Sequence, residues 1–119
     1  SRAFVLDTRH DCFDIQMEWE IESNDKFGVR VQGHQIEYCP AEQKINCLGT
    51  VAPVRSVDHR IALRLIVDRT SLELFAEDGT VVFSCTYIPE ATDHPLEFYS
   101  EGSTLMATLV VHELRSIWM

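Results

Sequence analysis

Three glutamates, Glu18, Glu20 and Glu22, alternate along one predicted strand face and form the most obvious row of carboxylates in the chain. The rise of a strand places neighbouring members about 6–7 Å apart. That separation overlaps the distances between the two carboxylates with which glycosidases cleave their substrates. Alternating acids are also common on a solvated strand face, and no sequence feature indicates a pocket around them. We therefore interpret this row as the water-facing side of a strand.

The cysteines and histidines show no spacing typical of a nucleophilic or metal site. Cys12 lies near His10 but lacks a third partner in sequence, and no G-x-S-x-G motif is present. The cysteines form no C-x-x-C pair and have no ligand-like spacing to the histidines. We expect no metal and no cofactor.

Four cysteines allow up to two disulfides in three connectivities, so the sequence leaves the disulfide state and the redox compartment open. Cys85 is in phase with Val81 and Phe83, which favours a small buried core residue. The four positions are Cys12, Cys39, Cys47 and Cys85.

Aromatic rings that stack on sugars are the remaining candidates for function. Tyr38, Tyr87 and Tyr99 are the predicted ligand contacts, although each can instead pack across a sheet. Trp19 is in phase with an apolar stripe, which favours a core position. Trp118 follows the last predicted strand, and we expect it to contact a neighbouring domain.

Composition narrows the class of protein. A chain of 119 residues with 45% hydrophobic content predicts one ordinary soluble globular domain, residues 1–119. The net charge of −9 argues against nucleic acid and against an anionic membrane surface, whereas neutral carbohydrate remains compatible. The simplest interpretation of this acidity is that it keeps the domain soluble.

The sequence leaves the cellular location open. No apolar run reaches the roughly 18 residues of a membrane span, and no signal-peptide pattern is present. Because the chain begins at Ser1 rather than Met, an upstream segment and secretion stay open. Extracellular, periplasmic and cytoplasmic locations are all compatible.

The elements are predicted to be strands throughout. Residues 13–22 alternate strictly between apolar and polar, which is typical of an antiparallel sheet with one face on a core and one in water. Further strands are predicted over 27–31, 36–39, 44–48, 61–68, 71–76, 81–87, 96–100 and 104–114, the last with Leu105, Ala107, Leu109 and Val111 on one face. Residues 49–59 are predicted to be a loop, and Asp78-Gly79 is predicted to be a two-residue hairpin turn.

No segment keeps helical spacing over ten residues. Eight or nine short strands with frequent turns predict two packed antiparallel sheets, a lectin-like β-sandwich. Asp68 and Arg69 are interpreted as a turn in which the aspartate bonds nearby backbone N–H groups.

One run also resembles a known family. The stretch V-D-R-T-S-L-E-L-F-A-E-D-G-T-V-V-F, with I-P shortly after, resembles the C-terminal β-sandwich domain of glycoside hydrolase family 32, which contains invertases, levanases and inulinases. Weaker similarities follow in order along the chain: Phe13-Asp14-Ile15, Phe27-Gly28-Val29-Arg30-Val31, Ala52-Pro53-Val54 and the ending Leu114-Arg115-Ser116-Ile117-Trp118.

The resemblance implies that catalysis belongs to a different domain. In that family the catalytic carboxylates come from an N-terminal five-bladed propeller, in motifs N-D-P-N, E-C and R-D-P. None of these motifs occurs in this sequence, so no catalytic residue can be assigned to it. The leading hypothesis is a non-catalytic module that packs against such a propeller and stabilises it.

Two alternatives belong to other classes of protein. The first is a free-standing carbohydrate-binding protein with fructan as its ligand. The second is a structural or oligomerisation domain that forms homo-oligomers without a ligand.

Overall fold

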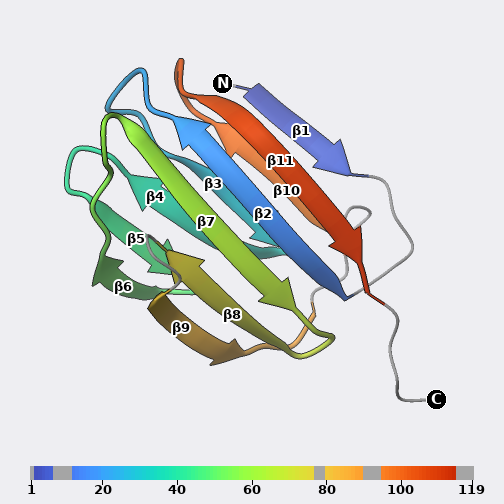
Figure 1. Ribbon diagram of the computed structural model, residues 1–119. Helices are drawn as coiled ribbons and strands as arrows, with labels where there is room; N and C mark the ends of the chain where they lie inside the picture. The colour runs from blue at the N-terminus through green and yellow to red at the C-terminus, as the bar shows by residue number, and fades with distance from the viewer. Residues whose placement is uncertain (1, 7–11, 77–79, 90–94, 115–119) are drawn as a thin grey trace.

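The chain folds into two antiparallel β-sheets stacked face to face (Figure 1). The computed structural model describes residues 2–6, 12–76, 80–89 and 95–114. One sheet has six strands in the order β1-β10-β3-β4-β5-β6, and the other has five in the order β11-β2-β7-β8-β9. The strands are β1 (Arg2–Leu6), β2 (Phe13–Glu20), β3 (Phe27–Val31), β4 (His34–Cys39), β5 (Lys44–Cys47), β6 (Thr50–Pro53), β7 (Arg60–Val67), β8 (Ser71–Ala76), β9 (Thr80–Thr86), β10 (Leu96–Ser100) and β11 (Leu105–Glu113).

This architecture confirms the predicted all-β sandwich. None of the described residues forms a helix long and apolar enough to cross a bilayer. The hairpin predicted at Asp78-Gly79 lies outside the described residues.

The core lies between the inward faces of the two sheets. β2 and β7 pair in register along their whole lengths, and their inward side chains are at most 5% exposed. Trp19 is one of them, and its ring centroid lies 4.6 Å from that of Phe27 in the facing sheet. The predicted core position of Trp19 is therefore confirmed. The inward residues of the two strands are Phe13, Ile15, Met17, Trp19, Ile61, Leu63, Leu65 and Val67.

Two edge strands were not predicted. β6 occupies part of the segment expected to be a loop, and β1 lies before the first predicted strand. β6 shows no alternation of burial, because it is a short edge strand whose Val51 is 55% exposed. It joins β5 through Leu48 and Gly49, both of which have positive φ, and leucine is not a residue that signals such a turn.

The predicted face of the last strand needs a correction. The pairing of β11 with β2 shifts register between Met106 and Thr108, so Ala107 is an extra residue on β11. Such a bulge reverses the alternation of side chains on one side of it. Met106 consequently joins Leu109 and Val111 against the core, whereas Ala107 is exposed. The side chain of Leu105 lies outside the described set.

Gly28 in β3 marks a close approach between strands. A Cβ atom at this position would lie 2.0 Å from the carbonyl oxygen of Ile36 in β4, which is a backbone atom that cannot swing aside. Gly28 is also paired with Tyr99 in β10 and with Glu37 in β4. The missing side chain leaves room above β3 for a side chain from a neighbouring strand.

We expect Gly28→Ala to lower the free energy of unfolding by about 1–3 kcal/mol, because the added methyl group forces β3 and β4 apart. Urea denaturation measures this change. Ser84→Ala, on an exposed position of β9, serves as the control and should stay within about 0.5 kcal/mol of the parent. An unchanged midpoint for Gly28→Ala would contradict the close approach.

Candidate functional site

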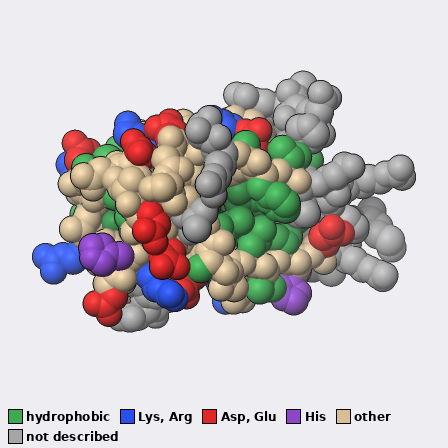
Figure 2. All heavy atoms as spheres, turned by 90° about the horizontal axis from the view of Figure 1, so that it is seen from above, with side chains coloured by type: hydrophobic (Ala, Val, Ile, Leu, Met, Phe, Trp, Pro, Cys, Tyr) green, Lys and Arg blue, Asp and Glu red, His purple; other side chains and the backbone are tan. Residues whose placement is uncertain are grey.

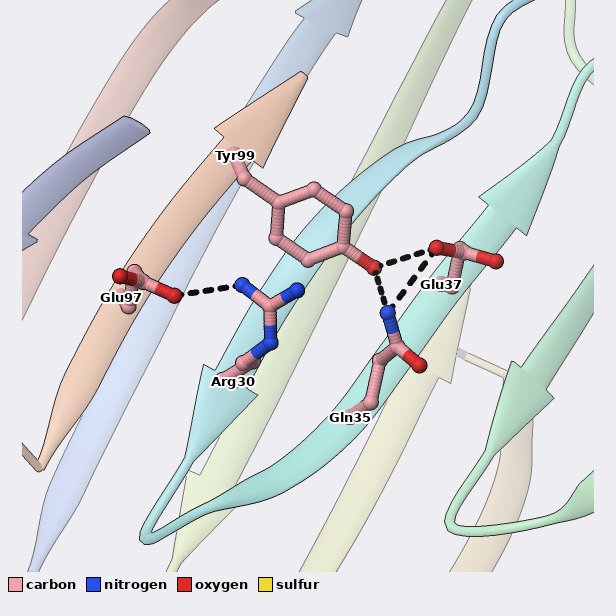
Figure 3. A network of polar contacts seen from close by, with 5 residues as sticks. All are labelled: Arg30, Gln35, Glu37, Glu97 and Tyr99. Atoms are coloured by element: carbon pink, nitrogen blue, oxygen red, sulfur yellow. Dashed lines mark hydrogen bonds and ion pairs between the residues drawn. The ribbon is translucent and has the colours of Figure 1, made fainter. Parts of the chain in front are cut away.

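Tyr99 lies on the outer face of the six-stranded sheet, at the centre of a polar cluster (Figure 3). Its ring extends from β10 across Gly28 toward β4, where its hydroxyl donates to Glu37 Oε2 at 2.7 Å. Gln35 Nε2 donates to the same hydroxyl at 2.6 Å and to Glu37 Oε2 at 3.0 Å. Hydrogen bonds therefore join Tyr99 of β10 to Gln35 and Glu37 of β4. They pass above Gly28 of β3, the strand that lies between β10 and β4.

A guanidinium group covers the ring of Tyr99. The Cζ atom of Arg30 lies 4.4 Å from the ring centroid, within the range of a cation–π contact. Arg30 is ion-paired with Glu97, and Lys26 Nζ lies 3.9 Å from Glu37 Oε1. We call Arg30, Gln35, Glu37, Glu97 and Tyr99 the Tyr99 cluster.

The Tyr99 cluster offers hydrogen bonds rather than covalent chemistry. Its guanidinium, amide and carboxylate groups can pair with hydroxyl groups of a neutral ligand. The side chain of Arg30 is 42% exposed, and that of Glu37 is 19% exposed, so both are open to solvent. A ring that stacked on Tyr99 would have to displace or share the position of Arg30.

Burial raises the pKa of the Tyr99 hydroxyl well above its usual value, and the hydrogen bond to the Glu37 carboxylate raises this pKa further. Both causes favour the neutral hydroxyl. Tyr99 is accordingly a hydrogen-bonding group at neutral pH.

Sequence reasoning named Tyr99 as a candidate ligand contact, which stays a prediction, and it did not name the side chains around it. Arg30, Gln35 and Glu37 occupy alternate, outward positions on β3 and β4. A glycine within a predicted strand is the available signal, because it often marks a close approach of other atoms.

The other two predicted tyrosines lie elsewhere. Tyr38 is 1% exposed within the sandwich, and its hydroxyl donates to the carbonyl oxygen of Val54 at 2.8 Å. Tyr87 is 7% exposed and donates to the carbonyl oxygen of Asp68 at 2.7 Å, with its ring edge-on to that of His34. The structure does not bring the three tyrosines together, since Tyr38 faces the core and Tyr99 the outer surface.

Arginines of the adjacent strand β7 pair with acids on the outer face of β2, including Glu18 and Glu20 of the predicted row, whereas Glu22 lies beyond the end of β2. Arg60 in β7 contacts Glu18 at 2.6 Å and Glu20 at 3.9 Å. Arg64 lies further along β7 on the same face as Arg60. It makes two hydrogen bonds to Asp14, at 3.0 and 2.7 Å. The hydrogen bonds from Arg64 hold the pKa of the Asp14 carboxyl below its usual value. This arrangement supports the interpretation of the row as a solvated sheet face.

Asp68 forms the predicted turn. Its carboxylate accepts from the backbone N–H of Arg69 at 2.7 Å and from the thiol of Cys12 at 3.3 Å. Both bonds lower the pKa of the Asp68 carboxyl, the backbone bond most strongly. The residue has a structural role in the connection from β7 to β8.

None of the four cysteines forms a disulfide. Cys85 is partly buried and packs against the core, as its phase predicted. Burial raises the pKa of the Cys47 thiol, and the nearby Cys85 raises it further, so Cys47 remains a protonated thiol rather than a nucleophile. No group of three or more metal-ligating side chains occurs among the described residues. Trp118 lies outside the described residues, so its expected contact with a neighbouring domain stays a prediction.

Comparison with known proteins identifies the family. The family model described as "Glycosyl hydrolases family 32 C terminal" matches residues 2–113. This chain belongs to that family.

Relatives of this family 32 domain include a levanase from Bacillus sp. (strain L7), which is 43% identical over 68 residues. That match covers 56% of this chain and 7% of the levanase. Among solved structures, the exo-inulinase from Aspergillus awamori aligns with a TM-score of 0.72 and 16% identity, over 99% of this chain and 27% of that chain. The carbohydrate binding module CBM66 from Bacillus subtilis aligns with a TM-score of 0.62 and 8% identity, over 93% of this chain and 77% of that module. The two structural matches show a shared fold.

The family 32 domain should become less stable in alkali through Tyr99. Because folding raises the pKa of this hydroxyl, its contribution is complete below about pH 10 and is lost as the pH rises further. At pH 8 we expect Tyr99→Phe to lower the free energy of unfolding by about 1 kcal/mol. Above pH 10 this difference should shrink by up to about 1.4 kcal/mol per pH unit, because only the parent chain must keep Tyr99 protonated.

Urea denaturation at pH 8 and at pH 11 measures both free energies. A difference between the parent and Tyr99→Phe that stays constant with pH would contradict a buried, neutral Tyr99 hydroxyl.

Proposed function

We propose that this domain is the non-catalytic C-terminal β-sandwich of an enzyme that hydrolyses fructans or sucrose. It packs against the five-bladed catalytic propeller of that enzyme and stabilises it. The observation that carries the proposal is the family match over residues 2–113, combined with the small share of a levanase, 7%, that the chain spans.

The sequence and the surface chemistry support the assignment of catalysis to another domain of the enzyme. The N-D-P-N, E-C and R-D-P motifs of the family's catalytic domain do not occur in the chain. The carboxylates with glycosidase-like spacing, Glu18 and Glu20, share Arg60 as an ion-pair partner. A catalytic carboxyl group must be free to reach a substrate atom, whereas these two side chains are engaged with Arg60 on an exposed sheet face.

We expect the purified 119-residue chain to release no reducing sugar from sucrose, levan or inulin. The native polypeptide, detected in its source with an antibody against this domain, should be several times larger and should hydrolyse at least one of these substrates. The immunoprecipitated native polypeptide is the positive control. Hydrolysis by the 119-residue chain, or a native polypeptide no larger than this chain, would contradict the proposal.

A second candidate function is fructan binding by the domain itself. It is favoured by the Tyr99 cluster, whose exposed donors and acceptors suit a neutral polyhydroxylated ligand, and by the fold shared with a carbohydrate binding module. Of the three predicted tyrosines, Tyr99 carries this candidate because its ring lies on an outer face. Tyr38 is 1% exposed, and Tyr87 and Tyr99 are both 7% exposed, so none of the three rings offers an open stacking face. Tyr99 differs from the other two in the exposed polar side chains that surround it on the outer face.

If the cluster binds fructan, the 119-residue chain should migrate more slowly in native gels that contain levan or inulin. Arg30→Ala should remove most of this retardation, because it deletes the exposed donor above Tyr99. Arg60→Ala, on the outer face of the other sheet, is the matched control and should leave the retardation unchanged. Equal migration with and without fructan would exclude binding at this site.

A further inference from the structure

Two cysteines meet across the interior of the sandwich. Cys47 ends β5 in the six-stranded sheet, and Cys85 lies near the end of β9 in the five-stranded sheet. Cys47 is paired with the buried Ile36 and Cys85 with the buried Leu72, so both side chains point between the sheets. A hydrogen bond joins the two thiols, which therefore form a contact between strands of different sheets.

The two thiols lie on the side of the sandwich away from β1 and β11. β9 ends the five-stranded sheet, and β5 is the last strand but one of the six-stranded sheet. Hydrophobic side chains gather at the surface on the side where β1 and β11 lie (Figure 2). Cys47, in contrast, is fully buried, whereas Cys85 is half-buried and packs against the core. Of the two thiols, the one on β9 is therefore closer to solvent.

The structure selects this pair from the connectivities that the sequence left open. Cys39 lies on the outer face of β4, because the adjacent Tyr38 points into the core, so its thiol is on the wrong side of the sheet to meet Cys47 or Cys85. Cys12 precedes β2, which β7 and β8 separate from β9. Three strand spacings amount to about 14 Å, about twice the largest usual separation of Cα atoms in a disulfide.

We propose that Cys47 and Cys85 form a stabilising disulfide between the two sheets when the chain folds in the presence of a disulfide oxidant, such as oxidised glutathione. The Cys85 thiolate attacks the oxidant and releases one glutathione thiolate. The sulfur of Cys47 then attacks Cys85 Sγ in the mixed disulfide and releases the second glutathione. The two protein thiols lose two protons and two electrons, and the oxidant is reduced to two thiols. This inference does not depend on the proposed function.

Burial determines when the bond forms. In the folded domain, burial raises the pKa of the Cys47 thiol to about 12, and the thiolate is the form that attacks a disulfide. In the unfolded chain Cys47 is solvated and ionises as an ordinary thiol does. The crosslink should therefore form while the domain folds, and at least tenfold more slowly once folding is complete.

The bond also requires β9 to move toward β5. Packed sheets lie about 10 Å apart, whereas a disulfide holds its two Cα atoms about 4.4–6.8 Å apart. β9 can make this movement because it is an end strand, hydrogen-bonded to β8. The closed loop contains β6, β7 and β8, and closing it removes conformational freedom from the unfolded chain.

Refolding the 119-residue chain from urea in a glutathione redox buffer at pH 8 tests this inference. After alkylation and proteolysis, mass spectrometry should find a linked peptide pair that contains Cys47 and Cys85 in most molecules. The oxidised chain should melt about 10 °C above the same chain reduced with a phosphine, because the crosslink restricts the unfolded state. The reduced folded chain, transferred to the same buffer, should form the linked pair at least tenfold more slowly.

Two variants show whether these changes come from this pair. Cys85→Ala should abolish both the linked peptides and the difference in melting temperature between the oxidised and reduced forms. Cys39→Ala, on the outer face of β4, is the matched control and should keep both. Each comparison is made between two redox forms of one variant, so a loss of stability from the substitution itself cancels.

Three outcomes would overturn the inference. One is a dominant disulfide that contains Cys12 or Cys39. Another is a refolded chain in which both Cys47 and Cys85 remain open to alkylation. The third is a linked pair without a rise in melting temperature, because strain in β9 would then offset the effect on the unfolded chain and the bond would not be stabilising.

Discussion

The packing of two apolar sheet faces against each other is the constraint on which the rest of this domain depends. β2 and β7 each bury four inward side chains, and each large apolar side chain contributes about 1.5–3 kcal/mol on burial. Because side chains alternate along a strand, this burial also determines which residues face outward. The contact between Trp19 and Phe27 joins the two sheets near the C-terminal end of β2.

The two outer faces use different interactions. On the five-stranded sheet, Arg60 and Arg64 neutralise acids of β2, so a row of carboxylates becomes a set of exposed ion pairs. On the six-stranded sheet, Gly28 leaves room for the ring of Tyr99, which links β10 to β4 above β3. The first arrangement is a solvated surface. The second is a connected polar cluster, because the buried hydroxyl of Tyr99 at its centre takes part in two hydrogen bonds.

The central strands and the edge strands β9 and β11 were predictable, whereas the edge strands β1 and β6 were not. Residues 13–20 and 60–67 have one buried and one solvated face, so their alternation is visible in the sequence. β1 and β6 pair on one side only, and exposed residues such as Phe4 and Val51 interrupt any alternation. The bulge at Ala107 moved Met106 into the core, which a strict period of two cannot anticipate. The sequence predicted Tyr99 as a candidate contact, but it did not predict Arg30, Gln35 and Glu37 around it.

The sequence by itself determined the all-β class, the strands of the core and membership of family 32, because these depend on local alternation and on a contiguous motif. Only the tertiary structure decided which outward residues meet. Tyr99 and Glu37 are separated by 62 residues, and they come together because β3 lies between β10 and β4. The unpaired Nε1 donor of Trp19 is likewise a property of the packed sandwich, since the indole ring is enclosed between the two sheets against Phe27.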